Sequence, residues 1–167
     1  DKLLVADFEE NILQFNVSNP YDISSATFDF SRNISATASL TTGLRWGPDG
    51  DELFVTGWFS GVDSYTTASP YDIGTLTPKD SNITYGSHGV AAIEFNNNGT
   101  KIYITRQDNF SVNQYSLSTA YDITTPTFEK SFNTISQEDD PNTFIWNNDG
   151  TVAHIAGIGR TVYQYTT

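Results

Sequence analysis

The chain has 167 residues, which is long enough for a buried core, and we treat residues 1–167 as a single domain or part of one. Its net charge of −12 argues against binding to nucleic acid, and the absence of cysteine excludes disulfides and thiolate metal sites. No apolar run approaches the roughly 18 to 20 residues that span a bilayer, so we expect no membrane insertion.

Short stretches with strand and turn character follow one another from the first residue. The chain opens on "DKLLVAD" and "NILQFNV", and its next repeat reads "GLRWGP", "DELFVTG" and "VDSYTT". Gly, Asn, Ser and Thr are abundant, and no long stretch of Ala, Leu, Glu and Lys occurs. This composition favours strands and turns, so we expect an all-β fold with almost no helix.

The tripeptide Tyr-Asp-Ile occurs at Tyr21, Tyr71 and Tyr121, a spacing of 50 residues. The period divides the chain into repeats at 1–50, 51–99 and 100–150, and a partial repeat at 151–167. Two apolar positions fall in register across them: Ile12, Val62, Val112 and Val162, and Phe15, Tyr65, Tyr115 and Tyr165. We expect the aspartates of the tripeptide, Asp22, Asp72 and Asp122, to bind backbone amides, and its Tyr and Ile to cover apolar surface.

A second mark of the repeat is Asp or Asn before Gly between two apolar runs, as in "RWGPDGDELFV", "EFNNNGTKIYI" and "IWNNDGTVAHI". Such pairs tolerate the positive φ angles of tight hairpins. We therefore predict hairpins with Gly50, Gly99 and Gly150 at their tips.

Each repeat then reads as four short antiparallel strands, the unit of a β-propeller blade. The chain holds the second to fourth strands of one blade, two complete blades, and the first three strands of another. These fourteen strands make about three and a half blades, whereas propellers usually close with four to eight. Three completions are open: a longer polypeptide, several copies sharing a ring, or strands donated by neighbours. We favour a homo-oligomer or larger assembly.

The stretch "NQYSLSTAYDITTPTF" resembles a repeat in propeller-like proteins of marine bacteria and their phages. Most of those proteins are uncharacterised surface or virion proteins, so the resemblance implies a location outside the cell, at a cell surface or on a virion. It covers essentially the whole chain and bears on architecture rather than on chemistry.

Catalytic signatures are sparse. The two histidines are His154, inside a predicted strand, and His88, in a glycine-flanked connection. No nucleophile elbow of the G-x-S-x-G type is present, so we expect no enzymatic activity and no required cofactor. Two groups of acids lie near turns and make Ca²⁺ a weak candidate, although the regular calcium-loop spacing is missing: Asp49, Asp51 and Glu52, and Glu138, Asp139 and Asp140.

The best candidates for ligand binding lie in the loops between the second and third strand of each blade, and in the connections between blades. The loops read "ADFEEN", "TGWFSG", "TRQDNF" and "AGIGRT", and they differ more between repeats than the strands do. Trp58 and Phe59 are suited to stacking on a sugar or to inserting into a partner. The polar candidates on the same face are His88, Arg106, Asp108, Asn109 and Arg160.

We therefore expect a non-enzymatic extracellular or virion-surface module that works by interaction and assembly. The alternative is a lectin-like propeller that binds surface glycans through Trp58 and Phe59. A third reading is a hydrolase with acids at the mouth of the channel, which requires two carboxyl groups across the scissile bond. N-glycosylation is a weak expectation at five sequons, Asn16, Asn33, Asn82, Asn98 and Asn109.

Overall fold

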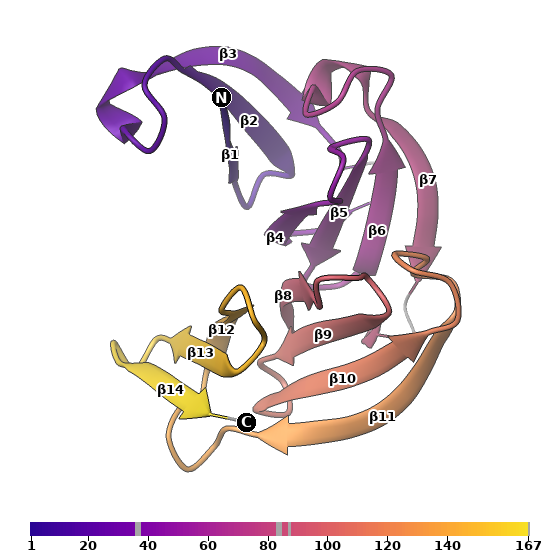
Figure 1. The fold of residues 1–167 in the computed structure, drawn as a ribbon, viewed down its shortest axis with the longest axis vertical. Coiled ribbons are helices and arrows are strands. Elements are labelled where there is room, and N and C mark those ends of the chain that lie inside the picture. The colour runs from indigo at the N-terminus through magenta and orange to yellow at the C-terminus, as the bar shows by residue number, and fades with distance from the viewer. Residues whose placement is uncertain (36–37, 83–84, 87, 167) are drawn as a thin grey trace.

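The computed structural model describes residues 1–35, 38–82, 85–86 and 88–166 and contains four antiparallel sheets arranged in an arc (Figure 1). The sheets are the predicted blades, and the all-β propeller architecture is confirmed. The first blade contains β1 (Lys2–Ala6), β2 (Asn11–Val17) and β3 (Ala26–Asn33). The second contains β4 (Thr41–Trp46), β5 (Glu52–Gly57), β6 (Gly61–Thr66) and β7 (Thr77–Asn82).

The third and fourth blades follow in the same order. The third contains β8 (Val90–Phe95), β9 (Lys101–Arg106), β10 (Ser111–Leu117) and β11 (Pro126–Asn133). The fourth contains β12 (Pro141–Trp146), β13 (Val152–Gly157) and β14 (Val162–Thr166). Strands β4, β8 and β12 lie on the inside of the arc, and β3, β7 and β11 lie on the outside (Figure 1). The described residues thus contain two complete blades between two three-stranded ones.

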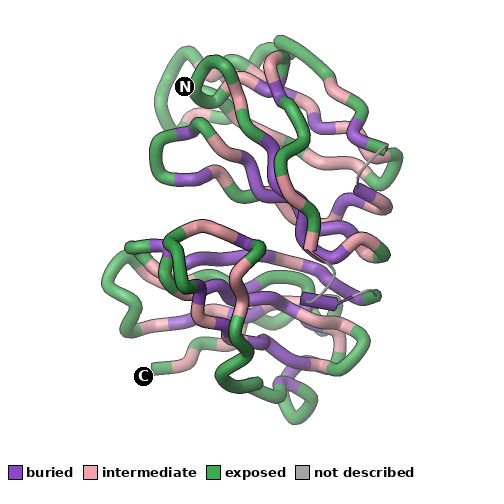
Figure 2. The backbone as a smooth tube through the Cα atoms, turned by 90° about the vertical axis from the view of Figure 1, so that its right-hand side faces the viewer, coloured by how far each residue is buried: buried purple, intermediate pink, exposed green. Residues whose placement is uncertain are grey.

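Strands β5 and β9 of the two complete blades are largely apolar and buried on both faces because each of these blades packs between two neighbours. In β5, Leu53 and Val55 face the first blade, whereas Phe54 faces the third. All three side chains are fully buried. The outermost strands are mostly exposed, and Figure 2 shows exposed positions concentrated in them and in the loops. The core of the protein is therefore a series of apolar layers between consecutive blades.

The predicted hairpin tips are confirmed. Gly50, Gly99 and Gly150 have φ values of 71°, 68° and 73°, in the left-handed region that glycine tolerates. Gly50 and Gly99 also lie directly under a tyrosine ring, because a Cβ there would approach the rings of Tyr71 and Tyr121 to within 2.4 and 2.2 Å. These two glycines therefore serve both the turn and the packing of the ring.

Each Tyr-Asp-Ile segment forms a turn held by its aspartate, as predicted. The carboxylates of Asp22, Asp72 and Asp122 accept hydrogen bonds from the backbone N–H two residues later, at 3.0, 2.8 and 2.9 Å. Hydrogen bonds from Ser24 and Thr124 hold the pKa of Asp22 and Asp122 below its usual value. Short 3₁₀ turns follow at Ile23–Ser25 and Ile73–Thr75.

The tyrosines of this tripeptide adopt an unexpected backbone conformation. Tyr21, Tyr71 and Tyr121 have φ values of 62°, 60° and 62°, which are unfavourable for a residue with a bulky side chain. In the second and third blades the hairpin of the same blade holds the tyrosine in place. The N–H of Tyr71 donates to the carbonyl of Gly50 at 2.8 Å, and its hydroxyl donates to that of Pro48 at 3.1 Å.

A register shift recurs between the two outer strands of the first three blades. It falls between Gln14 and Phe15, between Ser64 and Tyr65, and between Gln114 and Tyr115. The extra residue on the outer strand bends and twists the sheet locally. Because the shift falls at the same repeat position each time, the blades share their curvature as well as their strand order.

Candidate functional site

The predicted binding loops and the connections between blades lie together on one face, which we term the loop face. In the second blade, the N–H of Trp58 donates to the carbonyl of Leu40 in the preceding connection, at 3.0 Å. In the third, the N–H of Gln107 donates to Gly89 at 2.8 Å. Backbone hydrogen bonds therefore fix each loop to the connection that leads into its own blade.

Phe59 and His88 form an aromatic pair on the loop face. Phe59 follows β5, and His88 lies in the connection between β7 and β8. Their ring centroids are 5.3 Å apart with an interplanar angle of 88°, an edge-to-face contact. The Phe59 side chain remains 48% exposed, and His88 is also exposed, whereas Trp58 is half-buried. Of the two predicted aromatic residues, Phe59 is therefore the one with the more exposed ring.

Arg106 and Asp108 form a fixed ion pair next to this aromatic pair. Arg106 Nε donates to Asp108 Oδ1 at 2.9 Å, and Nη2 contacts the other carboxylate oxygen. Arg106 Nη1 also donates to the carbonyl of Tyr85 at 3.0 Å. With two partners, the guanidinium is held in one orientation, and the fork of hydrogen bonds to the carboxylate is geometrically specific.

Two glycines allow the connection before β8 to lie against this ion pair. A Cβ at Gly86 would come within 2.2 Å of Arg106 Nη1, and one at Gly89 within 2.7 Å of the Asp108 Cβ. Both glycines have positive φ, at 136° and 67°. Gly86 and Gly89 therefore place His88 beside the Arg106–Asp108 pair. The sequence signal for this arrangement was the glycine-flanked "YGSHGVA", which we interpreted as a connection between blades that carries the binding candidate His88.

The remaining polar candidates lie further along the loop face. Asn109 is exposed and accepts a hydrogen bond from Ser111 Oγ at 2.5 Å. Arg160 is exposed in the loop between β13 and β14, a blade away from Arg106. The structure thus brings Phe59, His88, Arg106 and Asp108 together on the second and third blades, and it leaves Arg160 on the fourth.

The acidic candidates for Ca²⁺ do not gather into a site. Glu138 is buried, and its Oε1 accepts hydrogen bonds from the N–H groups of Asp140 and Gly159 at 3.2 and 3.3 Å. Asp139 is exposed, and Glu52 pairs with Lys79 at 3.0 Å. Within the described parts of the chain, no group of three or more His, Cys, Asp or Glu side chains is placed to hold a metal ion.

One buried acid lies on the inner strands of the arc. Glu94 on β8 pairs with Arg45 on β4, with 2.7 Å between Oε1 and Nη2. Burial raises the pKa of the Glu94 carboxyl, and the charge of Arg45 opposes this shift. An ion pair of this kind neutralises the acid and does not supply the two facing carboxyl groups that glycoside hydrolysis requires.

The sequons differ in how available their amide nitrogens are. Asn16, Asn98 and Asn109 are exposed. Asn33 is also exposed, but its side-chain nitrogen donates to the carbonyl of Glu9 at 3.3 Å and to Asn11 Oδ1 at 3.2 Å. Asn82 is half-buried and donates its side-chain nitrogen, the atom to which a glycan would be joined, to the carbonyl of Ile123 at 2.7 Å. Glycosylation at Asn82 would therefore break a contact between the second and third blades.

Comparison with known proteins reveals likeness in fold alone. No family model and no curated protein matches the sequence. Among solved structures, the chain is similar to one from Bacteroides fragilis NCTC 9343, described as "a putative 6-phosphogluconolactonase", with a TM-score of 0.66 and 17% identity over 99% of this chain and 47% of the other. A Bacteroides uniformis ATCC 8492 protein with the same description has a TM-score of 0.62 and 10% identity, over 98% of this chain and 52% of the other. The β-propeller domain of Myceliophteria thermophila Cps50 (Swd1) has a TM-score of 0.60 and 12% identity, over 100% of this chain and 48% of the other.

These likenesses show the β-propeller fold, and the chain spans about half the length of each of those three proteins. They also correct one expectation. The sequence led us to expect a protein that is not an enzyme, but two of the similar structures bear an enzyme's name, so the sparse catalytic signatures do not justify that conclusion. At 10 to 17% identity, the likeness assigns no activity to this chain. None of the described helices is long or apolar enough to cross a membrane.

Proposed function

We propose that this chain is an interaction module that binds a macromolecular partner through its loop face. The observation that carries the proposal is the gathering of Phe59, His88, Arg106 and Asp108 from two blades into one surface. Phenylalanine and arginine are both enriched at the cores of protein interfaces, and arginine is also enriched at binding hot spots. The blades behind them supply a rigid support, so little conformational entropy is lost when a partner binds.

The proposal is tested by selecting peptide ligands from a random phage-display library against the immobilised chain. We expect the selected peptides to lose at least about tenfold in affinity when Phe59 is replaced by alanine, the cost of a central hot-spot residue. Phe28 is the matched control, because it is also an exposed phenylalanine but lies on the outer strand β3. Phe28→Ala should leave binding unchanged. A selection that yields no peptide whose binding depends on Phe59 would contradict a ligand site on the loop face.

A saccharide ligand is a second candidate, and the exposed ring of Phe59 is the observation that favours it. One face of a phenylalanine ring can stack on a sugar, while Asp108 and Arg106 offer an acceptor and donors for its hydroxyl groups. A glycan array separates the two candidates. Binding that Phe59→Ala abolishes would identify a saccharide site, whereas silence across the array would remove it. The location at a cell or virion surface stays a prediction.

A further inference from the structure

The isoleucine of the Tyr-Asp-Ile turn seals the interface between its own blade and the preceding one. Ile73 of the second blade is fully buried in the apolar layer that contains Ile12, Val55 and Tyr65. Ile123 of the third blade is 1% exposed, in the layer that contains Val62. The turn is therefore a wedge that closes each interface from the outer side.

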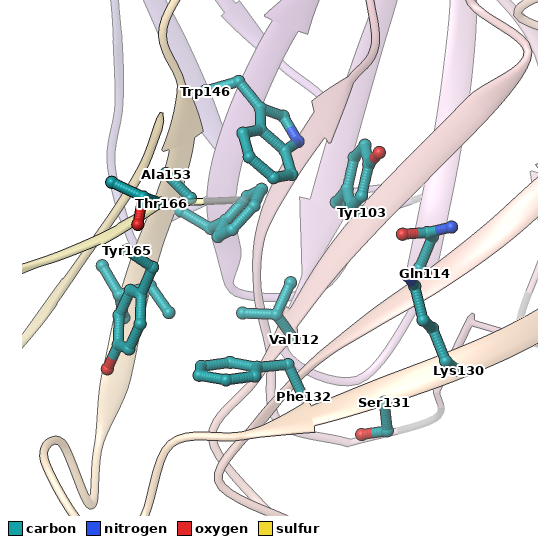
Figure 3. A pocket seen from close by; sticks show the side chains of 12 residues that line it. Tyr103, Val112, Gln114, Lys130, Ser131, Phe132, Trp146, Ala153, Tyr165 and Thr166 are labelled. Atoms are coloured by element: carbon teal, nitrogen blue, oxygen red, sulfur yellow. The ribbon is translucent and has the colours of Figure 1, made fainter. Parts of the chain in front are cut away.

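The corresponding place in the third interface is an open groove. It lies between the third and fourth blades, has a volume of about 320 Å³ and is lined mostly by apolar side chains (Figure 3). Val112, Ile155 and Tyr165 line it, at the repeat positions that Ile12, Val55 and Tyr65 occupy around Ile73. None of the described residues fills it as Ile73 and Ile123 fill the other two.

Aromatic rings make up much of the wall of this groove. Figure 3 shows Tyr103, Trp146, Phe132 and Tyr165 around the opening. The rings of Phe132 and Tyr165 are in edge-to-face contact, with centroids 4.9 Å apart. Phe132 is 45% exposed and occupies the position of Arg32 and Asn82, which donate hydrogen bonds to carbonyls of the two seated turns. At this repeat position the third interface therefore has an apolar phenylalanine, where the first two interfaces have a hydrogen-bond donor.

A polar anchor for a turn is also present. Gln14 Oε1 accepts a hydrogen bond from the N–H of Ile73 at 3.1 Å, while Gln14 Nε2 donates to Asp29 at 2.9 Å. Gln114 occupies the same repeat position, lines the groove, and also donates its Nε2, here to Glu129. Among the described residues, none donates to Gln114 Oε1. At the groove, Gln114 Oε1 is therefore the counterpart of Gln14 Oε1, which accepts the N–H of Ile73 at the first interface.

We propose that this groove binds a Tyr-Asp-Ile turn and its following strand from a further repeat of the same kind. The isoleucine fills the groove and donates its N–H to Gln114 Oε1. The strand pairs with the outer edge of β14, which no described strand covers. Strand addition of this type takes affinity from main-chain hydrogen bonds and specificity from a pocket for one side chain.

The occupant is an unpaired segment rather than the first repeat of a second copy. Ile23 is 79% exposed and Tyr21 fully exposed, so a second copy does present a free turn. The strand after that turn, β3, is already paired with β2 along its length, from Val17 opposite Ala26 to Asn11 opposite Asn33. In the second and third blades, the turn isoleucine fills the interface and the strand after it pairs as the outer strand of the blade. Only a segment whose strand is unpaired can do both at the fourth blade.

The probe is a fluorescent peptide with the sequence of residues 118–133, STAYDITTPTFEKSFN, titrated into the intact chain and followed by anisotropy. The matched control peptide carries asparagine in place of its isoleucine. We expect the control to bind at least about tenfold more weakly, because a polar side chain replaces the one that fills an apolar groove. Gln114→Ala should weaken the parent peptide about fivefold, the effect of one hydrogen bond. Thr42→Ala, in the second blade, should change nothing.

Three results would overturn the proposal. The first is equal binding of the two peptides, and the second is no binding of either to a chain that circular dichroism shows to be folded. The third is self-association of the chain alone, seen by sedimentation velocity and reversed by Ile23→Asn. That result would assign the groove to a second copy. Because Phe59 lies on the loop face, Phe59→Ala should leave peptide binding unchanged, so this test is independent of the proposed function.

Discussion

Replacing Ile123 with alanine removes the wedge between the second and third blades and should destabilise the fold. The side chain is 1% exposed, and it packs in the layer that contains Val62 and Tyr85. Alanine loses the transfer free energy of the missing carbons and leaves a cavity that the two rigid sheets cannot close, at a cost of about 2 to 5 kcal/mol. For a chain of this size, about 3 kcal/mol corresponds to a fall in melting temperature of roughly 6 to 12 °C.

The chain contains its own control for this substitution. Ile23 occupies the same place in the first repeat but is 79% exposed, so Ile23→Ala should change stability by less than about 0.5 kcal/mol. Both variants are measured by urea unfolding, followed in parallel by far-ultraviolet circular dichroism and tryptophan fluorescence to verify two-state behaviour. The reasoning is refuted if Ile123→Ala costs less than about 1 kcal/mol, or if the two substitutions cost the same.

Three further substitutions test other features of the blades. Gly99→Ala and Gly150→Ala both place alanine at positive φ, at a cost of about 1 to 2 kcal/mol each. Of these two positions, only at Gly99 does the new Cβ meet a ring, that of Tyr121, so the melting temperature of Gly99→Ala should fall further. Equal falls in melting temperature would contradict this packing. Burial raises the pKa of the Asp63 carboxyl, and neither of its oxygens has a hydrogen-bond partner among the described residues. The contribution of the neutral acid to stability is therefore lost as pH rises through the raised pKa. Asp63→Asn should therefore stabilise the chain at pH 7, with an advantage that shrinks as pH falls towards the range of an ordinary aspartate; an advantage independent of pH would contradict the assignment.

The strands, the hairpin tips and the aspartate caps could be predicted from the sequence. Each depends on the conformational preference of a few neighbouring residues, and the same residues recur in several repeats. The positive φ of Tyr71 and Tyr121 does not follow, because tyrosine disfavours that conformation. In these two blades the ring packs on the glycine at the tip of its own hairpin, whereas Tyr21 has the same φ while its ring is exposed. That contact spans more than 20 residues of sequence and depends on the arrangement of the finished blade.

The candidate site was predicted in part. The sequence identifies Phe59, His88, Arg106 and Asp108 as residues of one face, but not that Gly86 allows the connection to lie against Arg106. The assignment to equivalent loops also includes Arg160, because such a loop recurs in every blade. The repeat pattern alone does not show which of these loops lie next to one another. The groove escaped prediction because its walls come from two blades. The sequence did contain one indication of the groove. Gln14 and Gln114 occupy the same repeat position, and Gln14 binds the turn isoleucine Ile73.

The central claim is that the Tyr-Asp-Ile turn closes each interface between blades and that the third interface is open to such a turn. A crystal structure of the chain with the peptide of residues 118–133 tests it most directly. The account predicts the peptide isoleucine between Val112 and Ile155, its N–H on Gln114 Oε1, and the peptide strand paired with β14. A peptide bound elsewhere, or a groove closed by the chain's own side chains, would contradict it.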